Sequence, residues 1–237
     1  MLTKNKINFY FKNGYVILEN ILDNKTLSEL QESAMQLIEE YKKNRSSFIV
    51  DKKRNISNKG KMFLANRCED FPLMESFTKG NFMKSICEKI LGEKVYLFYE
   101  QVVNKEPQTD SKFSWHQDSS YVGHDHKPYL SVWIALCDTS ESNGALRILP
   151  HDLEQDMQIA EHKWSEKSSD LSMEVKEEKS ITCSVNEGSI ILFSSMTPHS
   201  SYPNKSQKSR PAYLCQYSSE PILPPPGSNK KFRSELI

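Results

Sequence analysis

The chain has 237 residues, of which 37% are hydrophobic and 26% are charged, and its 31 basic residues balance its 31 acidic ones. This length suits one sizeable core, and zero net charge gives no support for bulk attraction to nucleic acid or membranes. No apolar run approaches the roughly 20 residues of a membrane span, and residues 1–6 lack the apolar core that a signal peptide would have. Five scattered cysteines without a C-x-x-C pair predict free thiols and a cytoplasmic protein, namely Cys68, Cys87, Cys137, Cys183 and Cys215.

The first half of the chain is predicted to be mainly helical. Residues 5–13 predict a short helix that ends at Gly14, and residues 15–18 a strand. A helix capped by Asp23 or Asn24 runs to about Lys43. Its apolar residues follow helical spacing and predict one buried face: Leu27, Leu30, Ala34, Leu37, Ile38 and Tyr41. Residues 77–91 predict a further helix before Gly92.

The second half is predicted to consist mainly of strands, at residues 95–103, 129–137, 145–149, 189–193 and 212–217. Helices followed by many short strands indicate an α+β fold. Since neither a repeat nor a second core is visible, residues 1–237 are predicted to form a single domain. The polar stretches 45–61 and 153–180 are long for loops, so each is interpreted as a lid or as a mobile or disordered segment. Residues 221–237 are predicted to be a C-terminal tail.

Two histidines and one carboxylate carry most of the functional information. His116 and Asp118 stand two apart, so on a strand their side chains point the same way. His199 follows the predicted buried strand at 189–193 and has to approach from another strand. An isolated H-x-D is usually a surface pair. Together, however, the three match the facial triad of non-haem Fe(II) oxygenases, which leaves metal positions open.

An arginine follows the second histidine at a distance that suits the same site. Arg210 lies eleven residues after His199, about the span of a turn and the start of the next strand. From there its guanidinium can reach the far carboxylate of an organic acid bound to the metal, in bidentate geometry. A surface arginine is the alternative.

Four blocks give the chain a family resemblance, together with residues 9–30. They are residues 115–121 (WHQDSSY), 132–150, 188–193 (GSIILF) and 199–217. In order and spacing these resemble the phytanoyl-CoA dioxygenase (PhyH-like) family of Fe(II)/2-oxoglutarate-dependent oxygenases. The resemblance implies a double-stranded β-helix, a cupin-like jelly roll, with N-terminal supporting helices. It also implies a dioxygenase that uses Fe(II), 2-oxoglutarate and O₂ to hydroxylate an unactivated C–H bond, while 2-oxoglutarate is decarboxylated to succinate. Desaturation or oxidative cyclisation in a biosynthetic pathway is the alternative outcome.

The resemblance also implies roles for individual residues. His116, Asp118 and His199 match the metal ligands, and Arg210 matches the arginine that pairs with the distal carboxylate of 2-oxoglutarate. Four further positions match or lie near cosubstrate contacts: Ser201, Trp133, Gln101 and Lys105. For each of these four, an ordinary structural role stays open.

The substrate side is less defined by sequence. Four residues beside the metal motif are candidates for lining the pocket: Gln117, Ser119, Ser120 and Tyr121. A basic stretch would steer an anionic small-molecule substrate, although a solvated loop is the favoured interpretation: Lys52, Lys53, Arg54, Lys59 and Lys61. The oligomeric state has no sequence signal.

One departure and two competing interpretations remain. Family members commonly carry glycine-serine-histidine after the position of Pro150, whereas this chain continues with His151-Asp152-Leu153, so His151 is not assigned as a ligand. Halogenating relatives lack the carboxylate that Asp118 supplies, so halogenation is not expected. A metal hydrolase using His124, His126 and His151, and a non-catalytic jelly-roll binding protein, stay open as alternatives.

Overall fold

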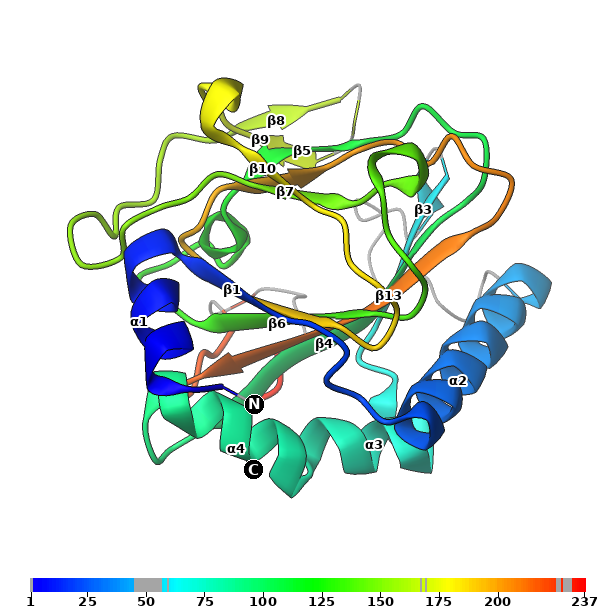
Figure 1. Cartoon of the computed structure of the whole chain (residues 1–237), viewed down its shortest axis with the longest axis horizontal. Helices are drawn as coiled ribbons and strands as arrows, with labels where there is room; N and C mark the ends of the chain where they lie inside the picture. Colours follow the sequence, from blue (N-terminus) through cyan, green and yellow to red (C-terminus); the bar gives the residue numbers. More distant parts are fainter. Residues whose placement is uncertain are drawn as a thin grey trace.

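The computed structural model describes residues 2–44, 57–58, 60–166, 168, 170–224, 227 and 232–237. Two antiparallel sheets lie one above the other, and α3 and α4 run beneath the larger of them (Figure 1). The architecture is therefore α+β with antiparallel sheets, as the order of predicted elements indicated.

The larger sheet has the order β1-β11-β6-β13-β4-β3-β2, with β14 paired to β4, and the smaller has the order β10-β7-β12-β5. The larger sheet contains β1 (Tyr15–Leu18), β11 (Ile190–Ser194), β6 (Leu130–Ala135), β13 (Arg210–Ser218), β4 (Tyr96–Lys105), β3 (Lys61–Ala65), β2 (Ser57–Asn58) and β14 (Glu235–Leu236). The smaller contains β10 (Ile181–Cys183), β7 (Leu146–Ile148), β12 (His199–Ser201) and β5 (Phe113–His116), and β8 (Lys163–Ser165) and β9 (Asp170–Ser172) form a separate hairpin.

The helices are α1 (Lys4–Asn13), α2 (Asn24–Lys43), α3 (Pro72–Lys79) and α4 (Asn81–Leu91). Asp23 caps α2 as predicted, because its carboxylate accepts a hydrogen bond from the Thr26 amide. The single helix predicted over 77–91 is wrong, since two helices meet at Gly80. The backbone of Gly80 is extended, and a Cβ there would lie only 2.2 Å from the Ser76 carbonyl oxygen, so the chain turns where no side chain fits.

The five predicted strands agree with β4, β6, β7, β11 and β13 to within two residues at each end. The stretch 153–180, interpreted from sequence as a lid or as a mobile or disordered segment, contains the β8–β9 hairpin. The predicted C-terminal tail likewise supplies β14. Most of the predicted loop 45–61 lies outside the described residues, including Lys52, Lys53, Arg54 and Lys59, whereas Lys61 begins β3.

Two hydrophobic clusters place the larger sheet in the middle of the molecule. One cluster packs α2, α3 and α4 on its outer face and includes Tyr213, Cys215 and Tyr217 of β13. The other fills the space between the two sheets and includes Ala212 and Leu214 of the same strand. Since all of β13 is buried, polar side chains on its inner face point into a space closed to bulk water.

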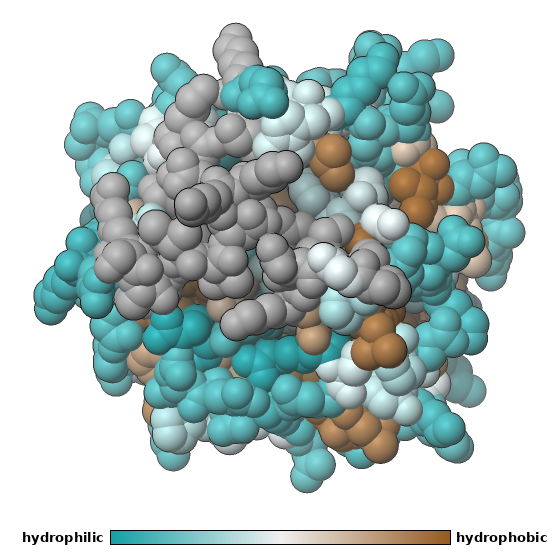
Figure 2. Space-filling view, turned by 180° about the vertical axis from the view of Figure 1, so that it is seen from behind, coloured by the Kyte–Doolittle hydropathy of each residue, from teal (hydrophilic) through white to brown (hydrophobic). Residues whose placement is uncertain are grey.

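The five cysteines are all free thiols, as predicted. Within the described ranges, no helix combines the length and the apolar character needed to cross a membrane. On the face seen from behind, the visible hydrophobic side chains are scattered among hydrophilic ones (Figure 2).

Gly14, at the C-terminal end of α1, packs closely against residues 151 and 197, and this contact gives a stability prediction. Gly14 is left-handed, and a Cβ there would lie 2.3 Å from the Thr197 side chain and 2.9 Å from the His151 carbonyl oxygen. We expect Gly14→Ala to lower the free energy of unfolding by about 2–4 kcal/mol, more than the conformational cost alone, about 1–2 kcal/mol. Urea titration measures the change. Gly188→Ala is the control, because Gly188 has the same φ of 76° but only ordinary contacts, so equal losses in both variants would contradict the packing argument.

Candidate metal centre

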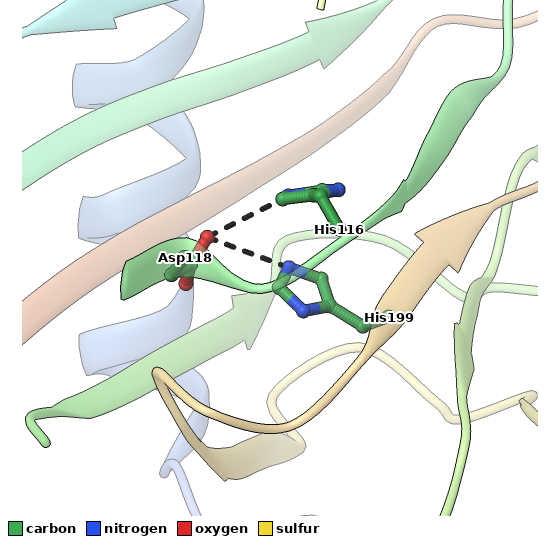
Figure 3. Close-up of side chains that lie close together, drawn as sticks. All are labelled: His116, Asp118 and His199. Carbon is green, nitrogen blue, oxygen red and sulfur yellow. Dashed lines mark ion pairs between the residues drawn. The ribbon is translucent and has the colours of Figure 1, made fainter. Parts of the chain in front are cut away.

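Two strands of the smaller sheet bring the three predicted ligands together. His116 ends β5 and pairs across the sheet with His199, which begins β12. Asp118 follows in a short 3₁₀ helix (Asp118–Tyr121), after an extended Gln117 that keeps it on the side of His116. The donor atoms of the three residues all lie within 4.8 Å of one another, and the side chains converge on one point (Figure 3).

Hydrogen bonds from both imidazoles fix which nitrogen faces that point. The Nδ1 atom of His116 lies 2.7 Å from the Ser114 carbonyl oxygen, and Nδ1 of His199 lies 3.0 Å from the Thr197 carbonyl oxygen. A carbonyl oxygen only accepts, so each Nδ1 carries the proton and donates it. Each Nε2 is therefore the nitrogen that faces Asp118, and it can bind a metal once it carries no proton.

The carboxylate is ionised although it is buried. Burial alone would raise the pKa of Asp118, but the neighbouring histidines and their hydrogen bonds outweigh burial and hold that pKa well below its usual range. One oxygen, Oδ1, lies 3.6 Å from Nε2 of His116 and 3.5 Å from Nε2 of His199. Two imidazole nitrogens and one carboxylate oxygen form a donor set that fits Fe(II).

The other carboxylate oxygen is held by two side chains that the sequence analysis did not single out. Oδ2 of Asp118 accepts hydrogen bonds from the Ser131 hydroxyl at 2.6 Å and from the Gln216 amide at 2.9 Å. Ser131 and Gln216 were the polar residues on the inner face of two predicted buried strands. That interruption of an apolar pattern was the signal available in the sequence.

Arg210 begins β13 and is buried with part of its guanidinium unsatisfied. Its Nε and Nη1 atoms have no hydrogen-bond partner among the described residues, and neither does the hydroxyl of the buried Ser201. Burial lowers the pKa of Arg210 to about 10, so the group stays charged at neutral pH. The guanidinium carbon lies 5.5 Å from the centre of the Trp133 ring. A buried cation with free donors fits an anionic ligand, because an unpaired buried charge is otherwise costly.

Arg210 is one of three basic residues on a single rung of the larger sheet. It pairs in register with Lys105 of β4, which pairs with Lys61 of β3. Burial, with Arg210 and Lys61 nearby, lowers the pKa of Lys105 to about 6, and its amine donates to the carbonyl oxygens of Ser111 and Tyr202. Lys61 lies 3.3 Å from the buried Asp170 carboxylate. Arg210 is therefore the member of this rung whose charge is neither neutralised nor paired.

The other predicted cosubstrate contacts lie on the same inner surface. Gln101 of β4 stands opposite Leu214 of β13, which in turn stands opposite Trp133 of β6. Trp133 is buried and Gln101 is half-buried. Trp133 thus contacts the Arg210 rung through its ring, whereas Gln101 lies four residues along β4 from Lys105.

The side chains of the four predicted pocket-lining residues make hydrogen bonds within the protein. The Gln117 side chain donates to the carbonyl oxygens of Gln158 and Met196 and accepts from the Ala160 amide. Ser119 and Ser120 donate to the Ser195 hydroxyl and to the Gln117 carbonyl oxygen. The Tyr121 hydroxyl accepts from the Leu171 amide. The segment 153–180 is thereby docked against the metal motif.

The histidines proposed for a hydrolase do not assemble. Among the described residues, His116, Asp118 and His199 are the one group of three metal-binding side chains whose donor atoms converge. His124 and His126 each contact a main-chain carbonyl oxygen through Nδ1, and their ring centres are 6.1 Å apart. The structure gives no support for a hydrolase centre at these positions.

Comparison with known proteins agrees with this geometry. Residues 10–212 match the family described as Phytanoyl-CoA dioxygenase (PhyH). The chain is 24% identical to a "Probable alpha-ketoglutarate-dependent hypophosphite dioxygenase" of Stutzerimonas stutzeri, over 91% of this chain and 78% of that protein. It is 21% identical to the "Phytanoyl-CoA dioxygenase" of Arabidopsis thaliana, over 90% and 87%.

Solved structures share the fold. One is EctD from S. alaskensis with 2-oxoglutarate and 5-hydroxyectoine, with a TM-score of 0.74, 18% identity and coverage of 98% of this chain and 84% of that chain. Another is the "non-heme alpha ketoglutarate dependent carbocyclase SnoK", with a TM-score of 0.71, 18% identity and coverage of 91% and 83%.

Proposed function

Because the chain belongs to the phytanoyl-CoA dioxygenase family, and is a 2-oxoglutarate-dependent non-haem iron dioxygenase, we propose that it hydroxylates an unactivated C–H bond of a small-molecule substrate. The observation that carries the proposal is the pairing of two features. A converging His–Asp–His set lies on one side, and a buried, incompletely satisfied arginine lies on the sheet facing it.

In this proposal His116, Asp118 and His199 hold the metal. Their donor set, the fixed imidazole tautomers and the ionised carboxylate all support it. With three protein ligands, the remaining positions of an octahedral ion are free for cosubstrate and dioxygen.

Arg210 is proposed to anchor the distal carboxylate of 2-oxoglutarate, with Ser201 donating a second hydrogen bond. The unsatisfied Nε, Nη1 and hydroxyl groups support both roles. Trp133 is proposed to support the cosubstrate beside the guanidinium, and Gln101 and Lys105 to complete its surroundings. Lys105 contributes as a neutral amine, because its pKa of about 6 leaves it uncharged at neutral pH.

When bound, Fe(II) with 2-oxoglutarate and dioxygen supplies the power to break a C–H bond while 2-oxoglutarate is converted to succinate and carbon dioxide. The residues of this chain bind, orient and shield. The three ligands and Arg210 are all less than a tenth exposed, so the protein keeps bulk water from the place where the bond is broken.

The fold itself is proposed to be a double-stranded β-helix, with the whole chain forming one domain. Two facing antiparallel sheets with a hydrophobic filling between them support this assignment. The helices α2, α3 and α4 would then serve as outer supports of the larger sheet.

The segment 153–180 is proposed to act as a cover over the metal centre. The Asp170 carboxylate accepts a hydrogen bond from the Ser114 amide and pairs with Lys61. The Met173 amide donates to the Trp115 carbonyl oxygen at 2.8 Å. The contacts with Ser114 and Trp115 fasten the hairpin side of the segment to β5, directly beside His116. Substrate entry would then require this cover to loosen.

A buried ion pair fastens the cover, and its removal gives a prediction. We expect Asp170→Asn to speed hydrogen exchange at the Leu171 and Met173 amides by about ten-fold or more, because Lys61 loses its buried counter-charge and β9 its hold on β5. Exchange followed by mass spectrometry measures this. Glu161→Gln, which removes the exposed partner of Lys163 in the same segment, should change little. Identical exchange in the two variants would refute the fastening role.

The substrate is proposed to be a small organic molecule. The names of two relatives point to small phosphorus compounds, one being "2-aminoethylphosphonate dioxygenase" of an uncultured bacterium, 24% identical over 61% of this chain and 54% of that protein. An anionic substrate would need a cation other than Lys61, since that amine already pairs with Asp170.

Oxidative cyclisation or desaturation is the second candidate outcome, and the carbocyclase SnoK, whose fold this chain shares, is named for a cyclisation. Mass spectrometry of products from a substrate panel separates the outcomes. Hydroxylation adds one oxygen atom, which becomes labelled from ¹⁸O₂, whereas cyclisation or desaturation removes two hydrogens. Loss of two hydrogens from the substrate together with succinate formation, and without any oxygen insertion, would reject the hydroxylase proposal. Failure to form succinate with any substrate would favour a binding protein.

A further inference from the structure

Two side chains of the larger sheet donate hydrogen bonds to the Asp118 carboxylate. Both histidines belong to the smaller sheet, whereas Ser131 and Gln216 belong to β6 and β13 of the larger one. These two residues are register partners on neighbouring strands, and the Gln216 amide also donates to the Ser131 hydroxyl at 3.1 Å. Asp118 therefore contacts both sheets, with one oxygen directed to each.

Both hydrogen bonds end on the same carboxylate oxygen of Asp118. Ser131 and Gln216 both donate to Oδ2 of Asp118, at 2.6 and 2.9 Å, and both side chains are buried. Only Oδ1 faces the two Nε2 atoms, at 3.6 and 3.5 Å. A carboxylate whose second oxygen already accepts two hydrogen bonds cannot turn that oxygen to a metal without breaking them, and each broken bond would leave a buried donor unsatisfied.

We propose that Ser131 and Gln216 are positioning residues that hold Asp118 as a one-oxygen metal ligand. The inference rests on the proposed assignment of Asp118 as a ligand. Its consequence is an open coordination position: a carboxylate free to rotate would bind through both oxygens and occupy a place that 2-oxoglutarate or dioxygen needs. The hydrogen bonds from Ser131 and Gln216 would thus influence both the affinity for the metal and the access of the cosubstrate to it.

The placement of these residues supports a role beyond packing. Each has an apolar neighbour two residues away on the same inner face, Trp133 beside Ser131 on β6 and Leu214 beside Gln216 on β13. A buried polar side chain in such a surface is costly unless it is hydrogen-bonded. Here the hydrogen bonds converge on the carboxylate that the proposed metal site uses, as partners of metal ligands do.

The test is an anaerobic Fe(II) titration of Ser131→Ala and Gln216→Leu, compared with Ser218→Ala. Ser218 is a buried serine of β13 that donates to the Glu220 carbonyl oxygen, outside the site. We expect Fe(II) affinity to fall by about 10- to 100-fold in the first two variants and to stay unchanged in the control. Ser131→Thr, which keeps the hydroxyl, should restore affinity. The absorbance band of the Fe(II)–2-oxoglutarate chelate should shift in Ser131→Ala and Gln216→Leu and stay in place in Ser131→Thr and Ser218→Ala.

Two comparisons keep this inference separable from the site assignment. If Asp118→Ala also binds Fe(II) normally, the ligand assignment itself is wrong. If Asp118→Ala loses Fe(II) while folded Ser131→Ala and Gln216→Leu keep wild-type affinity and an unshifted band, only the positioning role is overturned. Infrared difference spectra of the wild-type protein with ¹³C-labelled aspartate give a check that needs no variant. The wide splitting of a one-oxygen carboxylate supports the role, and the narrow splitting of a two-oxygen carboxylate contradicts it.

Discussion

Asp118→Ala, His116→Ala and His199→Ala should each abolish turnover through loss of iron, while the fold survives. The centre needs all three side chains to hold iron, because the open coordination positions provide no protein group that could replace a lost ligand. The expected loss of Fe(II) affinity exceeds about 100-fold. That figure is the upper end of the loss expected when a residue that hydrogen-bonds to a metal ligand is replaced. Equilibrium dialysis with Fe(II) under argon measures it, and circular dichroism reports the fold.

The matched control is His124→Ala. His124 is an exposed histidine that does not belong to the converging group. Its removal should leave Fe(II) binding and turnover unchanged. A ligand variant that keeps full activity with iron supplied near stoichiometry would remove that residue from the metal centre.

Substitution of Arg210 should separate cosubstrate binding from metal binding. Arg210→Lys keeps the charge but loses the two-pronged geometry, so 2-oxoglutarate affinity should fall by roughly ten-fold or more, the equivalent of a charge-assisted hydrogen bond of about 1.5–3 kcal/mol. Fe(II) affinity should stay nearly normal, because Arg210 does not belong to the converging ligand group. Arg147→Lys is the control, since Arg147 pairs with Glu177 outside the site.

Replacement of Arg210 should weaken 2-oxoglutarate binding but should not lower the stability of the protein without 2-oxoglutarate. Without cosubstrate, Arg210 is a buried charge with Nε and Nη1 unsatisfied, and replacing such a group by an apolar side chain of similar length is often neutral or stabilising. Arg210→Met should therefore melt at or above the wild-type temperature when 2-oxoglutarate is absent, and should lose the stabilisation that 2-oxoglutarate gives the wild type. A lower melting temperature in the absence of 2-oxoglutarate would show that the arginine is structural.

Local sequence patterns were sufficient for the elements that are amphipathic at helical spacing or continuously apolar. The helical face of α2 and the apolar strands β6 and β11 agree with prediction because one or both of their faces are packed against the core. The convergence of His116 and Asp118 was predictable from their spacing. Arg210 was interpretable only through its distance from His199 and the family resemblance, since burial is not visible in the sequence.

Features that depend on tertiary contacts were not predictable. The break at Gly80 follows from a close approach to the Ser76 carbonyl oxygen rather than from composition. The β8–β9 hairpin lies in a polar segment, and its contacts with the rest of the fold are long-range, among them the pair of Asp170 with Lys61. The grip of Ser131 and Gln216 on Asp118 joins residues far apart in the chain, so only the folded register brings them together.

The most direct test of the account is an anaerobic titration of 2-oxoglutarate into the Fe(II)-loaded protein, followed by the charge-transfer absorbance of the chelate. It tests the claim that the triad and Arg210 form one centre for iron and cosubstrate. We predict a saturable band in the wild-type protein, no band in Asp118→Ala, and a midpoint displaced by roughly ten-fold or more in Arg210→Lys. Absence of the band in the wild type, or an unchanged midpoint in Arg210→Ala, would contradict the account.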